Sequence, residues 1–185
     1  TVVIAAGTTE RLKIDASGLT INGAALSSGA TSINGLTDGY ATSSSTGLGA
    51  SALSATNNTG ANNTGIGNYA LTTNAGGTDN TAVGMSALKD NSSAVKNTAV
   101  GAFALTNQTT GNSNEAFGWK ALFSSTTGTY NTAVGQESMY PLTTGFRNVG
   151  VGNAALRLIT TGSYNTATGY GALFAVTTGT KNIGL

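Results

Sequence analysis

The sequence contains no cysteine and no histidine, and only 8% of its 185 residues are charged. Without cysteine the chain forms no disulfide, and a zinc site would have to consist of carboxylates alone, which is uncommon. The net charge is +1 and the basic residues are scattered, so the electrostatic patch that attracts nucleic acid or an anionic membrane is missing. No apolar run approaches the ~18 to 20 residues of a membrane helix. We therefore expect no nucleic-acid partner and no membrane insertion.

The composition is also unusual for a soluble monomer. Twenty-seven residues are glycine, and 39% are hydrophobic but mostly small, so the usual charged surface is lacking. Serine, threonine and asparagine are abundant, which makes disorder the first alternative to consider. A disordered linker, however, has no reason to keep apolar residues at fixed intervals, as this chain does.

A motif of 17 residues recurs without insertion or deletion along most of the chain. One copy begins with Asn97–Leu105, which reads Asn-Thr-Ala-Val-Gly-Ala-Phe-Ala-Leu, and closes with Thr-Thr-Gly at 109–111. Its first asparagine recurs at Asn63, Asn80, Asn97, Asn114, Asn131, Asn148, Asn165 and Asn182. A constant period of this kind is typical of a solenoid, in which each repeat stacks directly on its neighbour.

Each repeat is too short and too rich in glycine and β-branched residues to form a useful helix, since one glycine costs about 1 kcal/mol relative to alanine. We predict instead two short extended pieces, Thr98–Val100 and Phe103–Leu105, with a corner at Gly101. The Thr-Thr-Gly stretch makes the return turn. The predicted fold is all-β, a parallel β-solenoid with one repeat per coil.

Three regions are expected along the chain. Residues 1–26 form the first: Val2–Ile4 is a short strand candidate, and polar and apolar residues alternate over 10–15 and 19–22 around a turn, which predicts a hairpin over 10–23. This segment is either the tail of a preceding domain or a cap on the first coil. Residues 27–46 are a connector rich in serine, threonine and glycine, and 47–185 form the solenoid. Because the chain begins without methionine and stops four residues into a ninth unit, we expect it to be a piece of a longer protein.

Stacking turns each repeat position into a column. We expect the asparagines to form a buried ladder of amide hydrogen bonds, and the valine and leucine columns to meet inside the coil. Strand alternation then places alanine on the opposite face. A face restricted to such small residues indicates that another backbone approaches closely. We therefore predict a parallel, in-register homotrimer whose subunit contact consists of Ala82, Ala99, Ala116 and Ala133.

Large aromatic residues gather in the later repeats. Two interpretations remain open: the rings cover the sides of the rod or its subunit seams, or they form a shallow strip that binds sugar rings. The candidate glycan contacts are Trp119, Tyr130, Tyr140, Tyr164 and Tyr170.

No catalytic, metal-binding or cofactor-binding arrangement is evident, so we expect the protein not to be an enzyme. Without histidine or cysteine, acid–base chemistry falls on carboxylates, and those of the repeats occupy four different repeat positions: Asp79, Asp90, Glu115 and Glu137. A carboxylate pair assembled between subunits, as in a depolymerase, is the remaining alternative. The aspartate that recurs in calcium-binding nonapeptide repeats is missing.

The repeat unit resembles those of tailed-bacteriophage tail fibres over roughly residues 47–185, and more loosely the head repeats of trimeric autotransporter adhesins. The segment Thr9–Gly18 is similar to the strand that often precedes such repeats in phage fibres. The resemblance implies a structural, homotrimeric rod of the virion tail fibre that supports host attachment, with other fibre or virion proteins and a host surface glycan as partners. The alternative is a bacterial surface adhesin or a glycan-binding adhesin head. A column of threonines also suggests ice binding, although Glu115 and Val149 interrupt it.

Overall fold

The computed structural model describes residues 2–6, 9–15, 18–21, 24–25, 41–42, 45–54 and 59–185, with side chains for 45–54 and 59–185. Most of the predicted connector, residues 27–40, lies outside the described residues. Within them every regular element is a strand, and no helix is long and apolar enough to cross a bilayer.

The first sheet is antiparallel and contains the predicted hairpin. Its strands follow the order β1-β2-β3-β4, and the predicted hairpin corresponds to the pairing of β2 with β3. The strands are β1 (Val2–Ala6), β2 (Thr9–Asp15), β3 (Gly18–Ile21) and β4 (Ala24–Ala25).

The second sheet has ten strands and forms one wall of a parallel β-solenoid, which confirms the predicted fold class. From β6 onward every neighbouring pair is parallel, and each strand pairs with the one before it in the chain. The sheet begins inside the predicted connector, where β5 pairs antiparallel with β6. Its strands are β5 (Ala41–Thr42), β6 (Ser45–Leu48), β7 (Thr64–Ile66), β8 (Thr81–Val83), β9 (Thr98–Val100), β10 (Glu115–Phe117), β11 (Thr132–Val134), β12 (Val149–Val151), β13 (Thr166–Thr168) and β14 (Ile183–Gly184).

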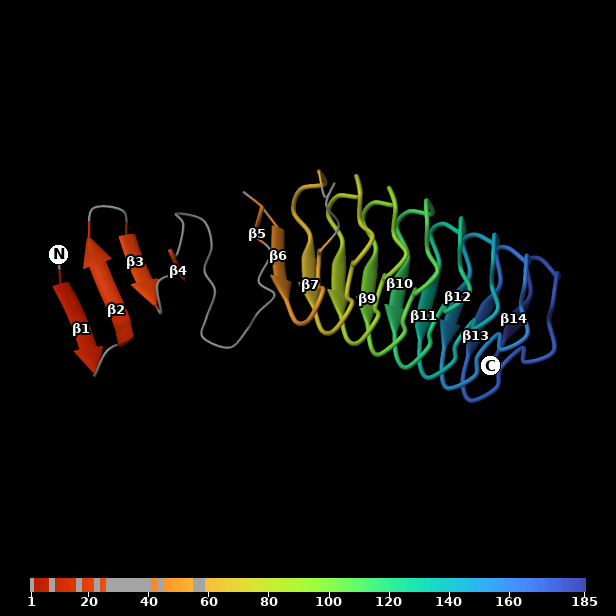
Figure 1. Cartoon of the computed structure of the whole chain (residues 1–185). Helices are drawn as coiled ribbons and strands as arrows, with labels where there is room; N and C mark the ends of the chain where they lie inside the picture. The colour runs from red at the N-terminus through yellow and green to blue at the C-terminus, as the bar shows by residue number, and fades with distance from the viewer. Residues whose placement is uncertain are drawn as a thin grey trace.

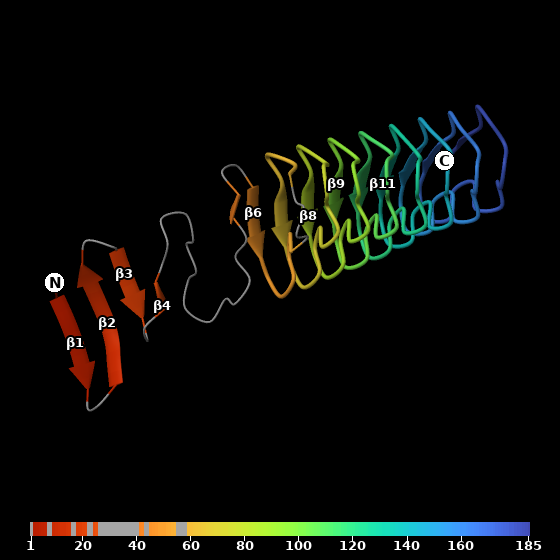
Figure 2. The same ribbon diagram turned by 45° about the horizontal axis from the view of Figure 1, so that its top comes forward.

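Each coil contains one strand, and turns make up the remaining walls (Figures 1 and 2). The prediction of a second extended piece at Phe103–Leu105 is wrong. Phe103 and Leu105 have left-handed backbones, with φ angles of 61° and 49°. Hydrogen bonds between coils hold them there, from the Phe103 N–H to the Met85 carbonyl (2.8 Å) and from the Leu105 N–H to the Ala121 carbonyl (3.0 Å). The stretch is therefore a tight turn.

The alanine column lies inside the coil, so the prediction that Ala82, Ala99, Ala116 and Ala133 form the subunit contact is wrong. These four side chains are fully buried within the single chain and belong to its core, together with the leucine column. The column consists of small residues because a leucine packs directly beneath it. At Gly65, which takes the place of alanine in the first coils, a Cβ would lie 3.3 Å from Leu53 Cγ of the preceding coil. The small residues are therefore required because a leucine of the same chain packs against them. The valine column faces outward, so the prediction that valine and leucine meet inside the coil is also wrong.

The asparagine ladder is present as predicted. The Asn97 Oδ1 accepts hydrogen bonds from both the backbone N–H (2.9 Å) and the side-chain amide (3.1 Å) of Asn114. The Asn114 amide also donates to the Gly128 carbonyl at 2.8 Å. The same pattern recurs up to Asn182, with one asparagine bonded to the next along the whole rod. The ladder thus satisfies polar groups that would otherwise be unpaired in a dry interior.

Candidate functional site

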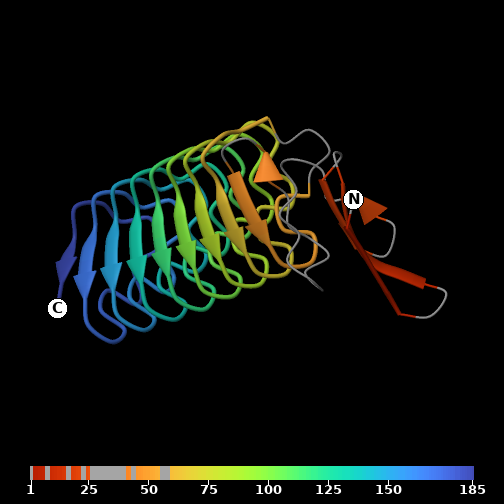
Figure 3. The same ribbon diagram turned by 90° about the vertical axis from the view of Figure 1, so that its left-hand side faces the viewer.

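The outer face of the solenoid sheet carries two adjacent columns, one mostly threonine and one mostly valine. In each three-residue strand the middle residue is buried and the two flanking residues point outward. The strands lie side by side, so these columns run the length of the wall (Figure 3). The apolar column comprises Leu48, Ile66, Val83, Val100, Phe117, Val134 and Val151 and ends with Thr168. The polar column comprises Thr46, Thr64, Thr81, Thr98, Glu115, Thr132, Val149 and Thr166 and ends with Ile183.

Charge is nearly absent from this face. Residues 59–185 contain ten charged side chains, of which only Glu115 belongs to either column. Glu115 accepts a hydrogen bond from the Thr132 hydroxyl at 2.9 Å. Meanwhile Ile66, Phe117 and Val134 each expose 36–39% of their surface. A continuous apolar column on a wall with one charged side chain makes this face the candidate contact surface.

The predicted glycan contacts do not form one strip. Trp119 and Tyr140 lie in the turn that follows the strand, while Tyr130 and Tyr164 lie in the turn that precedes it. Tyr170 is 86% exposed and has no ring or cation contact among those found in the described residues. The five aromatic residues therefore divide between two sides of the rod.

The turn before the strand carries a closed aromatic cluster around Arg147. Its guanidinium lies 5.7 Å from the Tyr130 ring centroid and 5.6 Å from that of Tyr164, and it donates a 2.9 Å hydrogen bond to the Tyr164 hydroxyl. Phe146 packs edge-on against Tyr164, with centroids 5.1 Å apart. Because these groups satisfy one another, the cluster is explained by packing alone.

The turn after the strand carries a second aromatic group. Phe123 and Tyr140 stack with centroids 5.2 Å apart, and Arg157 lies 4.6 Å from the Tyr140 ring. Arg157 also pairs with Glu137 at 2.9 Å. Beside this group the surface is hollowed over several coils, with a volume of about 730 Å³.

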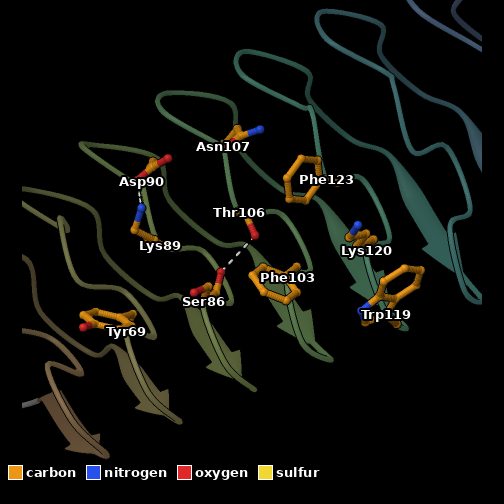
Figure 4. A pocket seen from close by; sticks show the side chains of 10 residues that line it. All are labelled: Tyr69, Ser86, Lys89, Asp90, Phe103, Thr106, Asn107, Trp119, Lys120 and Phe123. Carbon is orange, nitrogen blue, oxygen red and sulfur yellow. Dashed lines mark hydrogen bonds and ion pairs between the residues drawn. The ribbon is translucent and has the colours of Figure 1, made fainter.

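The hollow was not predicted, although the pattern of residues at one repeat position indicates it. Tyr69, Ser86 and Phe103 occupy equivalent positions in three successive repeats, so a small residue stands between two rings. Ser86 and Thr106 form the floor, where the Thr106 hydroxyl donates to the Ser86 carbonyl at 3.0 Å (Figure 4). The walls consist of Tyr69, Lys89, Asp90, Phe103, Asn107, Trp119, Lys120 and Phe123.

The four carboxylates of the repeats have separate partners. Asp90 pairs with Lys89 at 3.5 Å, and Glu137 and Glu115 have the contacts given above. Hydrogen bonds from Asn62 and Thr78 hold the pKa of the exposed Asp79 carboxyl below its ordinary value. Across residues 45–54 and 59–185, no three His, Cys, Asp or Glu side chains converge as a metal site would require.

Comparisons with known proteins add no relative to these observations. No protein-family model matches the chain, and neither a curated protein nor a solved structure is significantly similar to it.

Proposed function

We propose that this chain is a structural segment of a tail-fibre-like rod, in which three copies associate in parallel and in register through the threonine–valine face of the sheet. The observation that carries the proposal is this face itself, a continuous apolar column on a wall that holds a single charged side chain. Burying such a wall is favourable by about 25 cal/mol per Å² of apolar surface removed from water.

The distribution of charge selects this wall over the other sides of the coil. Nine of the ten charged residues of 59–185 lie in turns, including Lys96, Arg147 and Lys181 before the strand. A contact through the turns would desolvate those charges, and desolvated charges are costly unless they are paired. The sheet face brings only Glu115 into the contact, with its Thr132 hydrogen bond in place.

A rod is the natural product of this geometry. Every coil repeats the same outward columns in register, so a contact made by one coil is repeated by the next. Three walls facing a common axis would remove the face from water in a closed assembly. The likeness of the repeat to phage fibres supports a virion location and a role in host attachment. An adhesin remains the alternative, and tail or baseplate genes beside the coding sequence would favour the phage assignment.

Sedimentation equilibrium of the chain and of a charged variant tests the assembly. Val134 is 36% exposed on the proposed contact, so Val134→Lys buries an unpaired ammonium in the trimer and should shift the 18.2 kDa chain to monomer. Thr144→Lys, on an exposed turn, is the matched control and should remain trimeric.

A wild-type monomer at working concentration would overturn the proposal. Equal dissociation by both lysine variants would place the contact on another side of the coil. Ice binding needs the threonine column bare, so a trimer closed through this face would also argue against that alternative.

A further inference from the structure

We propose that the hollow lined by Tyr69, Phe103, Trp119, Lys120 and Phe123 binds an acidic saccharide. This inference goes beyond the proposed rod, which requires no ligand-binding surface. Figure 4 shows the lining in two rows along the coils, one from Tyr69 past Ser86 to Phe103 and Trp119, the other from Lys89 past Thr106 to Phe123.

The hollow exists because small residues interrupt both rows. Ser86 stands between the rings of Tyr69 and Phe103, and Thr106 stands between Lys89 and Phe123. Both small residues are buried on the floor, where the Thr106 hydroxyl donates a hydrogen bond to the backbone carbonyl of Ser86. Neighbouring coils are ~4.8 Å apart, so the rings of Tyr69 and Phe103, two coils apart, leave a gap of one coil above Ser86.

The lining suits sugar rings. Tyr69 and Trp119 are 45% and 41% exposed, so part of each aromatic surface is open to a ligand. Amphipathic rings offer an apolar face together with a polar tip, which matches the apolar and hydroxyl-bearing faces of a saccharide. The side chains of Asn107 and Asp90 add hydrogen-bonding groups at the rim.

The charge of the hollow favours an acidic ligand. Asp90 pairs with Lys89, so Lys120 is the unbalanced charge. Its ammonium lies 4.4 Å from the Trp119 ring centroid and 5.7 Å from that of Phe123, and no carboxylate pairs with it among the described residues. Arg157, two coils further along, is different because Glu137 neutralises it. A ligand carboxylate would give Lys120 the partner that Arg157 already has.

Trp119 is the only tryptophan of the chain, which makes its fluorescence a local probe. The test titrates the assembled protein with a hexasaccharide of alternating glucuronate and N-acetylglucosamine, and separately with sialyllactose. The neutral counterparts are the N-acetylglucosamine hexamer and lactose. We expect a saturable change in Trp119 emission with at least one acidic probe, much weaker with its neutral counterpart, and an affinity that falls as salt rises.

The affinities of two lysine variants, measured by calorimetry, test whether Lys120 binds the acidic group of the ligand. Lys120→Gln should weaken binding of the acidic probe about tenfold, the usual scale for losing a charge-assisted contact. Lys181→Gln, an exposed lysine in the last coil, should leave it unchanged. Equal effects of the two variants, or equal affinity for acidic and neutral probes, would overturn the assignment to an acidic ligand.

Two further results would overturn the proposal altogether. One is no saturable response to either acidic probe at millimolar concentration. The other is a Trp119 that acrylamide cannot quench in the ligand-free assembly, because the hollow would then be a subunit seam. Neither result affects the sedimentation test of the rod, so the two proposals fail separately.

Discussion

At the scale of single residues, the asparagine column connects the coils through their interior. Each internal asparagine accepts two hydrogen bonds from the next one and donates to a carbonyl of the return turn, as Asn114 does with Asn131 and Gly128. These groups are buried, so none of them can turn to water if its partner is removed. An unpaired buried polar group costs about 1–3 kcal/mol.

Asn114→Ala therefore leaves the Asn131 backbone N–H and side-chain amide without their shared acceptor. We expect the free energy of unfolding to fall by roughly 3 kcal/mol or more. Asn182→Ala is the matched control, because Asn182 is half-buried in the last coil and its side chain only donates to Asn165. Thermal and urea unfolding should show a much smaller change for the control. Similar losses in both variants would mean that the ladder contributes little beyond local turn geometry.

A second buried column is polar in the early coils and apolar in the later ones. It begins with asparagine and ends with aliphatic residues, in the order Asn74, Asn91, Gln108, Ser125, Leu142 and Ile159. At the change of chemistry, the Gln108 Oε1 and the Ser125 hydroxyl have no hydrogen-bond partner. The same interior space thus accommodates either a hydrogen-bonded amide or an apolar side chain, and only the transition is left unsatisfied.

At the scale of one coil, the corner glycine is required by both its backbone and its neighbour. Gly118 has a φ angle of 136°, and a Cβ there would lie 2.6 Å from the carbonyl carbon and oxygen of Gly135 in the next coil. Gly169 has a similar φ angle of 120°, but the nearest atom to its Cβ would be 3.7 Å away. Both positions therefore have a strained backbone for an L-residue, but only Gly118 is also in close contact with the next coil.

Gly118→Ala should consequently destabilise the solenoid much more than Gly169→Ala. Backbone strain of about 1–3 kcal/mol is common to both variants, and only the first adds a clash between coils. We expect the melting temperature, followed by circular dichroism, to fall by several degrees more for Gly118→Ala. Equal falls would show that the conformation of the corner alone, without the spacing of the coils, demands glycine.

The coil also shows what the sequence could and could not predict. The constant period identifies the stacked units, and the strand at Thr98–Val100 follows from its β-branched residues. Phe103–Leu105 looks equally extended in sequence, yet inter-coil hydrogen bonds stabilise left-handed backbones that these residues disfavour in isolation. Such bonds cannot be seen from one repeat.

The sequence also does not show which columns face the interior of the coil. Alternation separates alanine from valine, but it does not say which of the two faces lies inside. That choice depends on the leucines, which the unexpected turn directs beneath the strand and which leave room only for a methyl group there. The arrangement of the aromatic residues in a single strip could not be judged from the sequence for a related reason. The turns place these residues on two sides of the rod.

At the scale of the whole solenoid, each coil contacts only its neighbours, so the repeat should be removable as a unit. Deleting residues 114–130 joins Ser113 to Asn131, which then takes the place of Asn114 in the ladder and brings Gly135 above Gly101. Deleting 122–130 alone leaves the segment 114–121 with too little chain to close a coil. The first variant should fold and the second should not.

We expect the 114–130 deletion to keep a cooperative thermal transition, a β-type circular dichroism spectrum and the oligomeric state of the parent, with a mass lower by one unit per chain. The same deletion removes Trp119, Lys120 and Phe123, so binding of the acidic saccharide, measured by calorimetry, should disappear while assembly persists. Unfolding of this variant would show that the coils depend on more than their immediate neighbours. Retained binding by a folded variant would place the saccharide elsewhere on the rod.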